Sequence, residues 1–159
     1  MELSKSVKII GMSLAVLLFL ATLNSMNFFF GFLKVTFNEW LVFNACAPSS
    51  ITYLTGFVIF LITKNKTGLV VAVLPIVFFG TMGLFIFPWS GMNIIAQISH
   101  LLMTLNIAWA LWIVLKLKDY KAIAIGLLIS IILFVPYISY QQYYCRIHPE
   151  DLQRILNIH

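Results

Sequence analysis

Four polar side chains recur along one apolar stretch, residues 92–115, at a spacing that places them on one face of a helix. They are Asn93, Gln97, His100 and Thr104, whose i, i+4, i+7, i+11 positions fall within a sector of roughly 60°. Such a seam can line a pocket or pathway, with His100 as a ligand anchor or a proton-sensitive group. It can equally join neighbouring helices through hydrogen bonds, a common use of these residue types in membranes. Both interpretations predict that the seam faces protein or a water-filled cavity rather than lipid.

The scarcity of histidine and charged residues in the apolar stretches limits the chemistry that the seam can perform. His100 is the one histidine within the apolar stretches, since His148 and His159 lie in the polar tail. Bis-histidine ligation of haem or a metal needs a second histidine in the membrane, so we predict no metal and no cofactor. The apolar stretches also hold no Asp, Glu, Lys or Arg, which ion-driven pumps usually place in the membrane. A neutral or lipophilic solute therefore fits the seam better than a charged one.

The two cysteines, Cys46 and Cys145, are both expected near the outer face of the membrane. A disulfide between them is geometrically possible if their Cα atoms come within about 7 Å in an oxidising compartment. The alternative is two buried free thiols that pack as small apolar side chains. The sequence has no Cys-x-x-Cys pair, so a thiolate metal site or a thiol oxidoreductase has little support.

A dense polar cluster follows the last apolar stretch, from Cys145 to Asp151, and a Cys–His pair there could support nucleophilic chemistry. The alternative is an ordinary helix start, because Pro149 and Glu150 suit the first turn of a helix. An apolar i, i+3, i+4 stripe follows, which consists of Leu152, Ile155 and Leu156. We predict an outer amphipathic tail helix over 146–159, lying on the membrane or on the outer loops.

Composition indicates the kind of fold that must position these residues. The chain has 159 residues, of which 62% are hydrophobic and 9% are charged, whereas about a quarter of a soluble domain is charged. Long apolar runs recur instead of the period-two alternation of barrel strands. The net charge of +5 comes from Lys and Arg in short loops, which argues against nucleic acid as a partner. We therefore predict an all-α, multi-pass transmembrane helical bundle in the cell membrane, with the lipid bilayer as its main partner.

Five apolar stretches are long enough to cross a hydrocarbon core about 30 Å thick. Within one bundle domain, 1–145, they cover residues 9–33, 41–63, 68–87, 92–115 and 122–144. The region 40–63 has two interpretations, because Pro48 disfavours helix at Ala47. It is either one kinked helix or an interfacial helix, 39–46, followed by a short span that starts at Pro48. The second is favoured because proline suits the first turn of a helix.

The basic residues predict an orientation. With five spans and the N-terminus inside, seven lysines lie on the inner side and three basic residues on the outer side. This bias predicts the N-terminus inside and the C-terminus outside. The inner set is Lys5, Lys8, Lys64, Lys66, Lys116, Lys118 and Lys121, and the outer set is Lys34, Arg146 and Arg154.

Three functions follow as hypotheses. The first is binding or transport of a neutral or lipophilic small solute, with the seam of Asn93, Gln97, His100 and Thr104 as its lining. The alternative is a non-catalytic accessory or structural subunit of a larger membrane complex, because so small a bundle has little interior of its own. A homo-oligomer or a partner membrane subunit is expected for the same reason. The third is a membrane-embedded enzyme with chemistry at the outer face, which would require Cys145 or His148.

Overall fold

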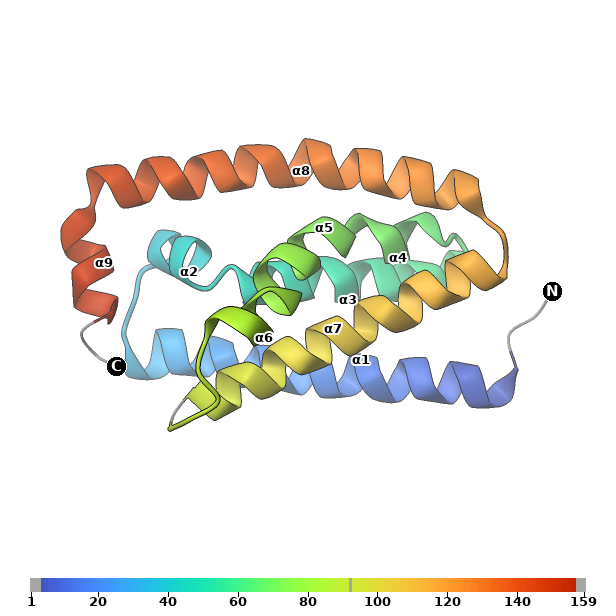
Figure 1. The fold of residues 1–159 in the computed structure, drawn as a ribbon, viewed down its shortest axis with the longest axis horizontal. Coiled ribbons are helices and arrows are strands. Elements are labelled where there is room, and N and C mark those ends of the chain that lie inside the picture. Colours follow the sequence, from blue (N-terminus) through green and yellow to red (C-terminus); the bar gives the residue numbers. More distant parts are fainter. Residues whose placement is uncertain (1–3, 92, 157–159) are drawn as a thin grey trace.

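The computed structural model describes residues 4–91 and 93–156; Met92, residues 1–3 and 157–159, and the side chains of Leu152 and Leu156 lie outside the described residues. Within the described residues every regular element is a helix and there are no strands, which confirms the predicted all-α class (Figure 1). The elements, of which η1 and η2 are π-helical, are α1 Lys5–Met26, η1 Asn27–Phe32, α2 Phe37–Phe43, α3 Cys46–Thr63, α4 Thr67–Val71, α5 Val73–Pro75, η2 Ile76–Thr81, α6 Gly83–Ile86, α7 Asn93–Lys116, α8 Tyr120–Ile147 and α9 Pro149–Leu156.

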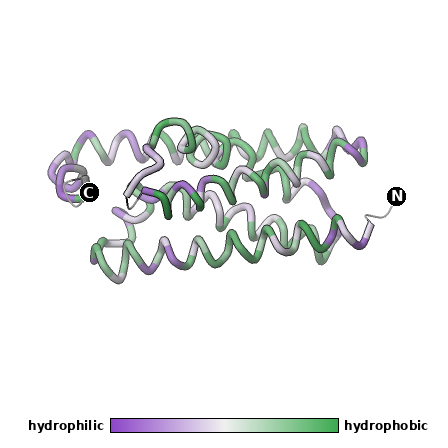
Figure 2. Tube along the Cα trace, turned by 60° about the horizontal axis from the view of Figure 1, so that its bottom comes forward, coloured by the Kyte–Doolittle hydropathy of each residue, from purple (hydrophilic) through white to green (hydrophobic). Residues whose placement is uncertain are grey.

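Five helical stretches are long and apolar enough to cross a membrane, as the sequence predicts. Figure 2 shows hydrophobic residues along these stretches and hydrophilic residues gathered at their ends and in α9. The five stretches are Lys5–Phe32, Cys46–Thr63, Thr67–Ile86, Asn93–Lys116 and Tyr120–Ile147.

The region after η1 forms two helices, the second of the two arrangements considered for it. Thr36 caps α2 through a capping box, in which its hydroxyl accepts from the Glu39 N–H and Glu39 Oε2 accepts from the Thr36 N–H. Helix α3 then begins at Cys46, earlier than the expected start at Pro48. Pro48 lies in the first turn of α3, where its missing N–H breaks no helical hydrogen bond.

The third candidate span is not one regular helix but α4, α5, η2 and α6 in succession. Directly after Pro75 the chain winds as a π-helix, shown by the hydrogen bond from the Met82 N–H to the Val77 carbonyl five residues earlier (3.0 Å). Single π-helical turns inside helices frequently mark functional sites. This segment packs against α7, so the irregular helix faces the predicted polar seam.

The core lies where α1, α3, α4 and α7 meet, and α8 covers it along α4 and α5. Tyr53 and Met103 are fully buried there. Two polar groups on α7 join it to α1: Asn106 Nδ2 donates to the Leu14 carbonyl (3.0 Å) and Trp109 Nε1 to the Val7 carbonyl (3.2 Å). Asn106 therefore serves a second helix interface, away from the seam.

The lysine-rich end of the bundle is the end at which α1 begins, α3 meets α4 and α7 meets α8 (Figure 1, right). At the opposite end α9 docks on α2. Ile155 is buried in a cluster with Trp40, and Arg154 forms an ion pair with Glu39. The tail helix therefore lies on the neighbouring loop and helix. It starts at Pro149 rather than at 146, because Arg146 still belongs to α8.

Candidate functional site

The predicted seam lies against the irregular third span. Gln97 and His100 are buried, and Thr104 and Asn93 are half-buried. The Thr104 hydroxyl lies 3.0 Å from that of Thr81 in η2 and donates to the His100 carbonyl (2.9 Å). Three of the four seam residues thus have partners inside the bundle, as the helix-joining interpretation predicts. Among the described residues, no hydrogen bond connects Asn93 to the other three.

Gln97 fixes the orientation of the His100 ring. The Gln97 amide nitrogen donates to the carbonyls of Phe87 (2.5 Å) and Gly83 (3.3 Å). The amide oxygen lies 3.2 Å from His100 Nδ1 and, as an acceptor, requires the proton on that nitrogen. His100 Nε2 is then an acceptor that points away from Gln97.

The acceptor at His100 Nε2 faces Cys46, for which the sequence left open a disulfide with Cys145 or a free thiol. The Cys46 sulfur lies 3.2 Å from Nε2 and 3.6 Å from the Phe79 carbonyl, and both cysteines are free thiols in the structure. A thiolate–imidazolium pair here would bury two charges in a medium of low dielectric constant, which is costly. The contact is therefore neutral, and the single thiol proton has two acceptors within reach, His100 Nε2 and the Phe79 carbonyl.

The His100 ring fits between two neighbours. The Phe87 ring stacks on it with centroids 5.8 Å apart. On another side Gly83 comes so close that a Cβ there would lie 2.7 Å from the imidazole. The seam is therefore packed by protein on the side of the third span.

A small recess lies beside the Cys46–His100 contact, on the side of α1. Its volume is about 20 Å³, enough for one water-sized group. Its lining residues come from three helices, whereas the seam lies on one helix. Most of its polar side chains carry a hydroxyl group. We call it the hydroxyl recess; it is lined by Leu18, Ala21, Thr22, Ser25, Cys46, Ala47, Ser50, Ser99 and Met103.

The hydroxyl recess offers both acceptors and a donor. Thr22 donates its proton to the Leu18 carbonyl (2.8 Å), and Ser99 donates to the Ile95 carbonyl (3.2 Å). Ser25 receives a hydrogen bond from the Asn44 amide (2.9 Å). With these protons committed to the backbone, the oxygen lone pairs of Thr22 and Ser99 remain as acceptors. Ser25 keeps its own hydroxyl proton, so the recess suits a neutral group such as a hydroxyl, which can both donate and accept.

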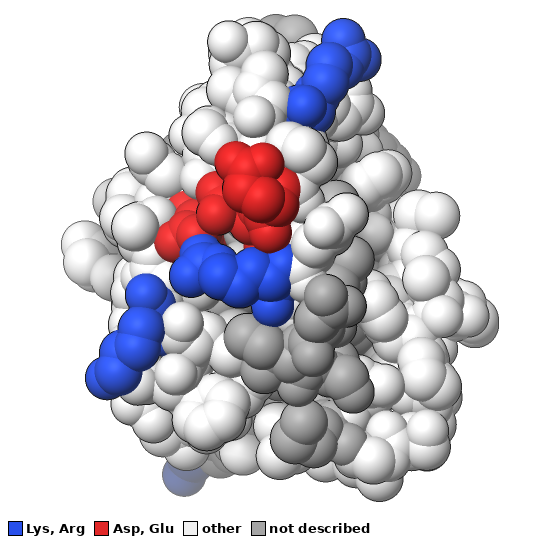
Figure 3. All heavy atoms as spheres, turned by 90° about the vertical axis from the view of Figure 1, so that its left-hand side faces the viewer, with Lys and Arg blue, Asp and Glu red and all other residues white. Residues whose placement is uncertain are grey.

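The polar cluster at the end of α8 forms a docking contact for α9. His148, Glu150 and Asp151 place one potential metal-ligand atom each within 4.8 Å of one another. The same groups have protein partners: Tyr144 donates to Asp151 (3.1 Å), and His148 lies 3.5 Å from Glu150. Figure 3 shows the acidic side chains beside basic ones on this face. Among the described residues, no hydrogen bond joins Cys145 to His148, so this structure offers no activated Cys–His pair at this end.

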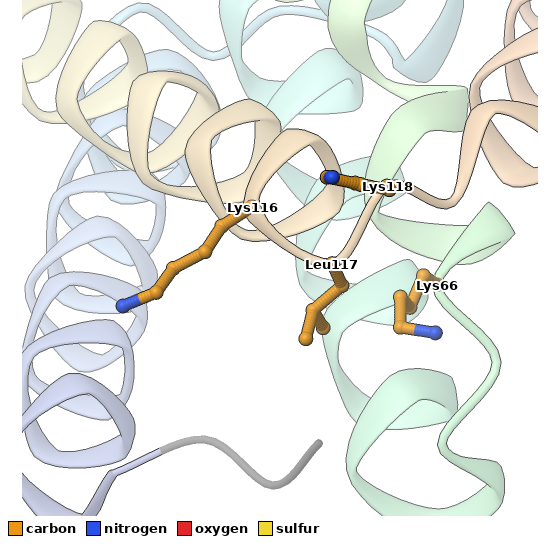
Figure 4. A pocket seen from close by; sticks show the side chains of 4 residues that line it. All are labelled: Lys66, Lys116, Leu117 and Lys118. Atoms are coloured by element: carbon orange, nitrogen blue, oxygen red, sulfur yellow. The ribbon is translucent and has the colours of Figure 1, made fainter.

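A second hollow lies at the lysine-rich end, where the α3–α4 and α7–α8 turns meet. Its volume is about 360 Å³, and Lys66, Lys116, Leu117 and Lys118 line it (Figure 4). The Lys66 ammonium donates to Asp119 Oδ2 (2.8 Å), which joins the two turns. We call this hollow the lysine hollow.

Asp119 supports a prediction about pH. The hydrogen bond from Lys66, followed by that from the Ala122 N–H, lowers the pKa of the Asp119 carboxyl. Because folding lowers this pKa, the contribution to stability is present above the ordinary carboxyl pKa of about 3.9 and is lost as the pH falls through the lowered value. Asp119→Asn is expected to reduce the melting temperature slightly at neutral pH and to make no difference at about pH 2. Thermal unfolding in detergent at both pH values measures this, with Glu150→Gln as a control that should not show the same pattern.

Sequence reasoning found the seam but missed its most informative neighbour. Cys46 and His100 are 54 positions apart, and no periodicity in either helix signals their contact. The hydroxyls of the recess are spread over α1, α3 and α7 and follow no motif. No protein-family model, no curated protein and no solved structure matches this chain, so the assignment of function rests on the geometry alone.

Proposed function

We propose that this chain is a multi-pass protein of the cell membrane that binds a neutral, lipophilic molecule at the hydroxyl recess. The observation that supports this is a recess between three apolar helices whose mostly apolar lining carries several hydroxyl groups and no charged side chain. Each of three hydroxyls has one protein partner, but Thr22 and Ser99 keep oxygen lone pairs and Ser25 keeps its proton. In an apolar environment a further hydrogen bond to such groups is favourable. A molecule with one hydroxyl or N–H group and an apolar body would form that bond, with its body against the exposed side chains of Leu17 and Ile98.

The proposal gives the seam a supporting role. Gln97, His100 and Thr104 hold α7 to the irregular third span, and His100 positions the Cys46 thiol at the edge of the recess. A continuous polar pathway along the seam has less support than binding, because protein partners already occupy these groups. Binding is therefore favoured over transport.

The proposed orientation places the lysine-rich end inside the cell. Seven lysines belong to that end, and Lys34, Arg146 and Arg154 belong to the other segments. This asymmetry matches the excess of basic residues found in cytoplasmic loops. The hydroxyl recess, near the start of α3, then lies toward the outer half of the bilayer.

Filling the recess provides the test. Ala21→Phe adds a ring to its lining and removes no polar group, whereas Ala124→Phe makes the same change on an exposed surface of α8. Native mass spectrometry on protein gently extracted from its own membrane is expected to show a bound small molecule in the wild type and in Ala124→Phe. We expect its loss in Ala21→Phe.

Two outcomes would contradict this proposal. One is a small molecule retained equally by all three proteins, which would place its site elsewhere. The other is a foreign polypeptide at fixed stoichiometry that dissociates only in Ala21→Phe. That result would identify the recess as the docking point for a polar side chain of a partner helix and would favour the accessory-subunit alternative.

A further inference from the structure

We propose that the lysine hollow binds the headgroup phosphate of an anionic phospholipid. The inference concerns the opposite end of α3 and α7 from the hydroxyl recess and does not depend on that site. It requires only that the lysine-rich end meets a leaflet that contains anionic lipid.

The hollow has the size and the composition of a headgroup site. Its volume of about 360 Å³ falls within the range of about 300–1,000 Å³ usual for small-ligand pockets. Three of its four lining residues are lysines, and the fourth, Leu117, is apolar. Basic pockets between membrane helices on the cytoplasmic side are known to bind anionic headgroups.

The hollow carries an uncompensated positive charge. Lys66 is paired with Asp119, so the charges of these two residues cancel. Among the described residues, neither Lys116 nor Lys118 forms a salt bridge. Lys116 instead lies over the Trp112 ring, with its ammonium 4.6 Å from the ring centroid. Two cations therefore remain available to an anion.

The walls of the hollow are held in place before any ligand arrives. The Lys66–Asp119 bridge connects the two turns, and Asp119 also caps α8 through the Ala122 N–H (3.2 Å). Lys118 adopts a left-handed backbone (φ 53°), and its N–H bonds the Leu115 carbonyl (2.9 Å) to close the end of α7. Preorganised walls reduce the entropy lost on binding.

The layout favours a phospholipid over a free phosphate. Figure 4 shows the three ammonium groups standing apart around the hollow instead of meeting at one point, with Leu117 between Lys116 and Lys66. A headgroup that carries hydroxyl groups beside its phosphate can reach more of these ammonium groups than a phosphate ion alone. Beside the hollow, Trp112 and Leu115 are 45% and 53% exposed. They offer an apolar surface on which acyl chains can lie.

The test compares two double variants of equal charge in lipid nanodiscs. Lys116→Ala with Lys118→Ala removes the free cations of the hollow, and Lys5→Ala with Lys8→Ala removes two exposed lysines of the same end that do not line it. Native mass spectrometry measures retained phosphatidylglycerol against phosphatidylcholine. We expect the wild type and the Lys5/Lys8 variant to prefer phosphatidylglycerol, and the Lys116/Lys118 variant to lose about tenfold of that preference.

A charge-preserving variant keeps the test decisive if the alanine variant folds poorly. Lys116→Arg with Lys118→Arg should restore the preference for phosphatidylglycerol. Equal losses in both alanine variants would show a non-specific surface effect and overturn the proposal. Inorganic phosphate that displaces phosphatidylglycerol at millimolar concentration would also overturn it, because the hollow would then be a phosphate site rather than a phospholipid site.

Discussion

Gly56→Ala is expected to destabilise the protein by about 3 kcal/mol, the upper end for overpacking of a buried contact. At this position α3 meets the start of α4 backbone to backbone: a Cβ on Gly56 would lie 2.0 Å from the carbonyl oxygen of Gly68. A backbone atom cannot swing aside as a side chain can, so the two helices must separate. Unfolding in detergent, followed by circular dichroism, measures the loss.

Gly31→Ala is the matched control for this substitution. A Cβ at Gly31 would approach only the Asn27 side chain, at 3.0 Å, and we expect a change within about 0.5 kcal/mol. Gly68→Ala tests the same contact from the other side, since its Cβ would lie 2.8 Å from the Gly56 carbonyl. If Gly56→Ala unfolds like the wild type, the close approach of α3 and α4 is not a feature of the folded protein.

Gln97→Leu is expected to cost about 2 kcal/mol of unfolding free energy, from three polar contacts at roughly 0.6 kcal/mol each. The substitution removes the donor to the carbonyls of Phe87 and Gly83 and the acceptor for the Nδ1 proton of His100. The Gly83 carbonyl keeps a hydrogen bond from the Phe87 N–H (3.2 Å), so the loss falls mainly on the Phe87 carbonyl and the imidazole. The His100 ring then loses the contact that orients it toward Cys46.

The control variant for Gln97→Leu is Ser99→Ala, on the same helix. Ser99 donates only to the Ile95 carbonyl of its own helix, so Ser99→Ala should change stability little. Equilibrium unfolding in mixed micelles compares the two variants. A Gln97→Leu protein that keeps full stability but no longer retains the bound small molecule would instead show that the seam itself lines the ligand site.

The two cysteines illustrate how far sequence reasoning reaches. Their positions in the chain indicate that both lie near the same end of the bundle, and they allow either a disulfide or two free thiols. The structure has free thiols, because Cys46 begins α3 and faces His100. The residue that Cys46 contacts depends on which neighbour its face of α3 meets. The position of a residue along a span does not specify that neighbour.

The sequence by itself determined that the protein is helical, with five helices able to cross a membrane. Backbone groups in a membrane are satisfied by helices or closed barrels, and long apolar runs without the period-two alternation of barrel strands favour helices. It also determined that Gln97, His100 and Thr104 share one face of α7, because the helical repeat is fixed. Local signals placed the break before α3 and the start of α9 near Pro48 and Pro149.

The tertiary structure alone decided which elements meet the face of α7 that carries Gln97, His100 and Thr104. It also decided where the hydroxyl recess and the lysine hollow lie. A helical period gives a direction around one helix but not the identity of the helix opposite it. The contact of Cys46 with His100 and the hydroxyl recess of α1, α3 and α7 are made by residues far apart in the chain. The lysine hollow likewise arises from two turns joined through Lys66 and Asp119. Such sites depend on helix packing, which is set by side-chain shape across an interface and not by any pattern along the chain.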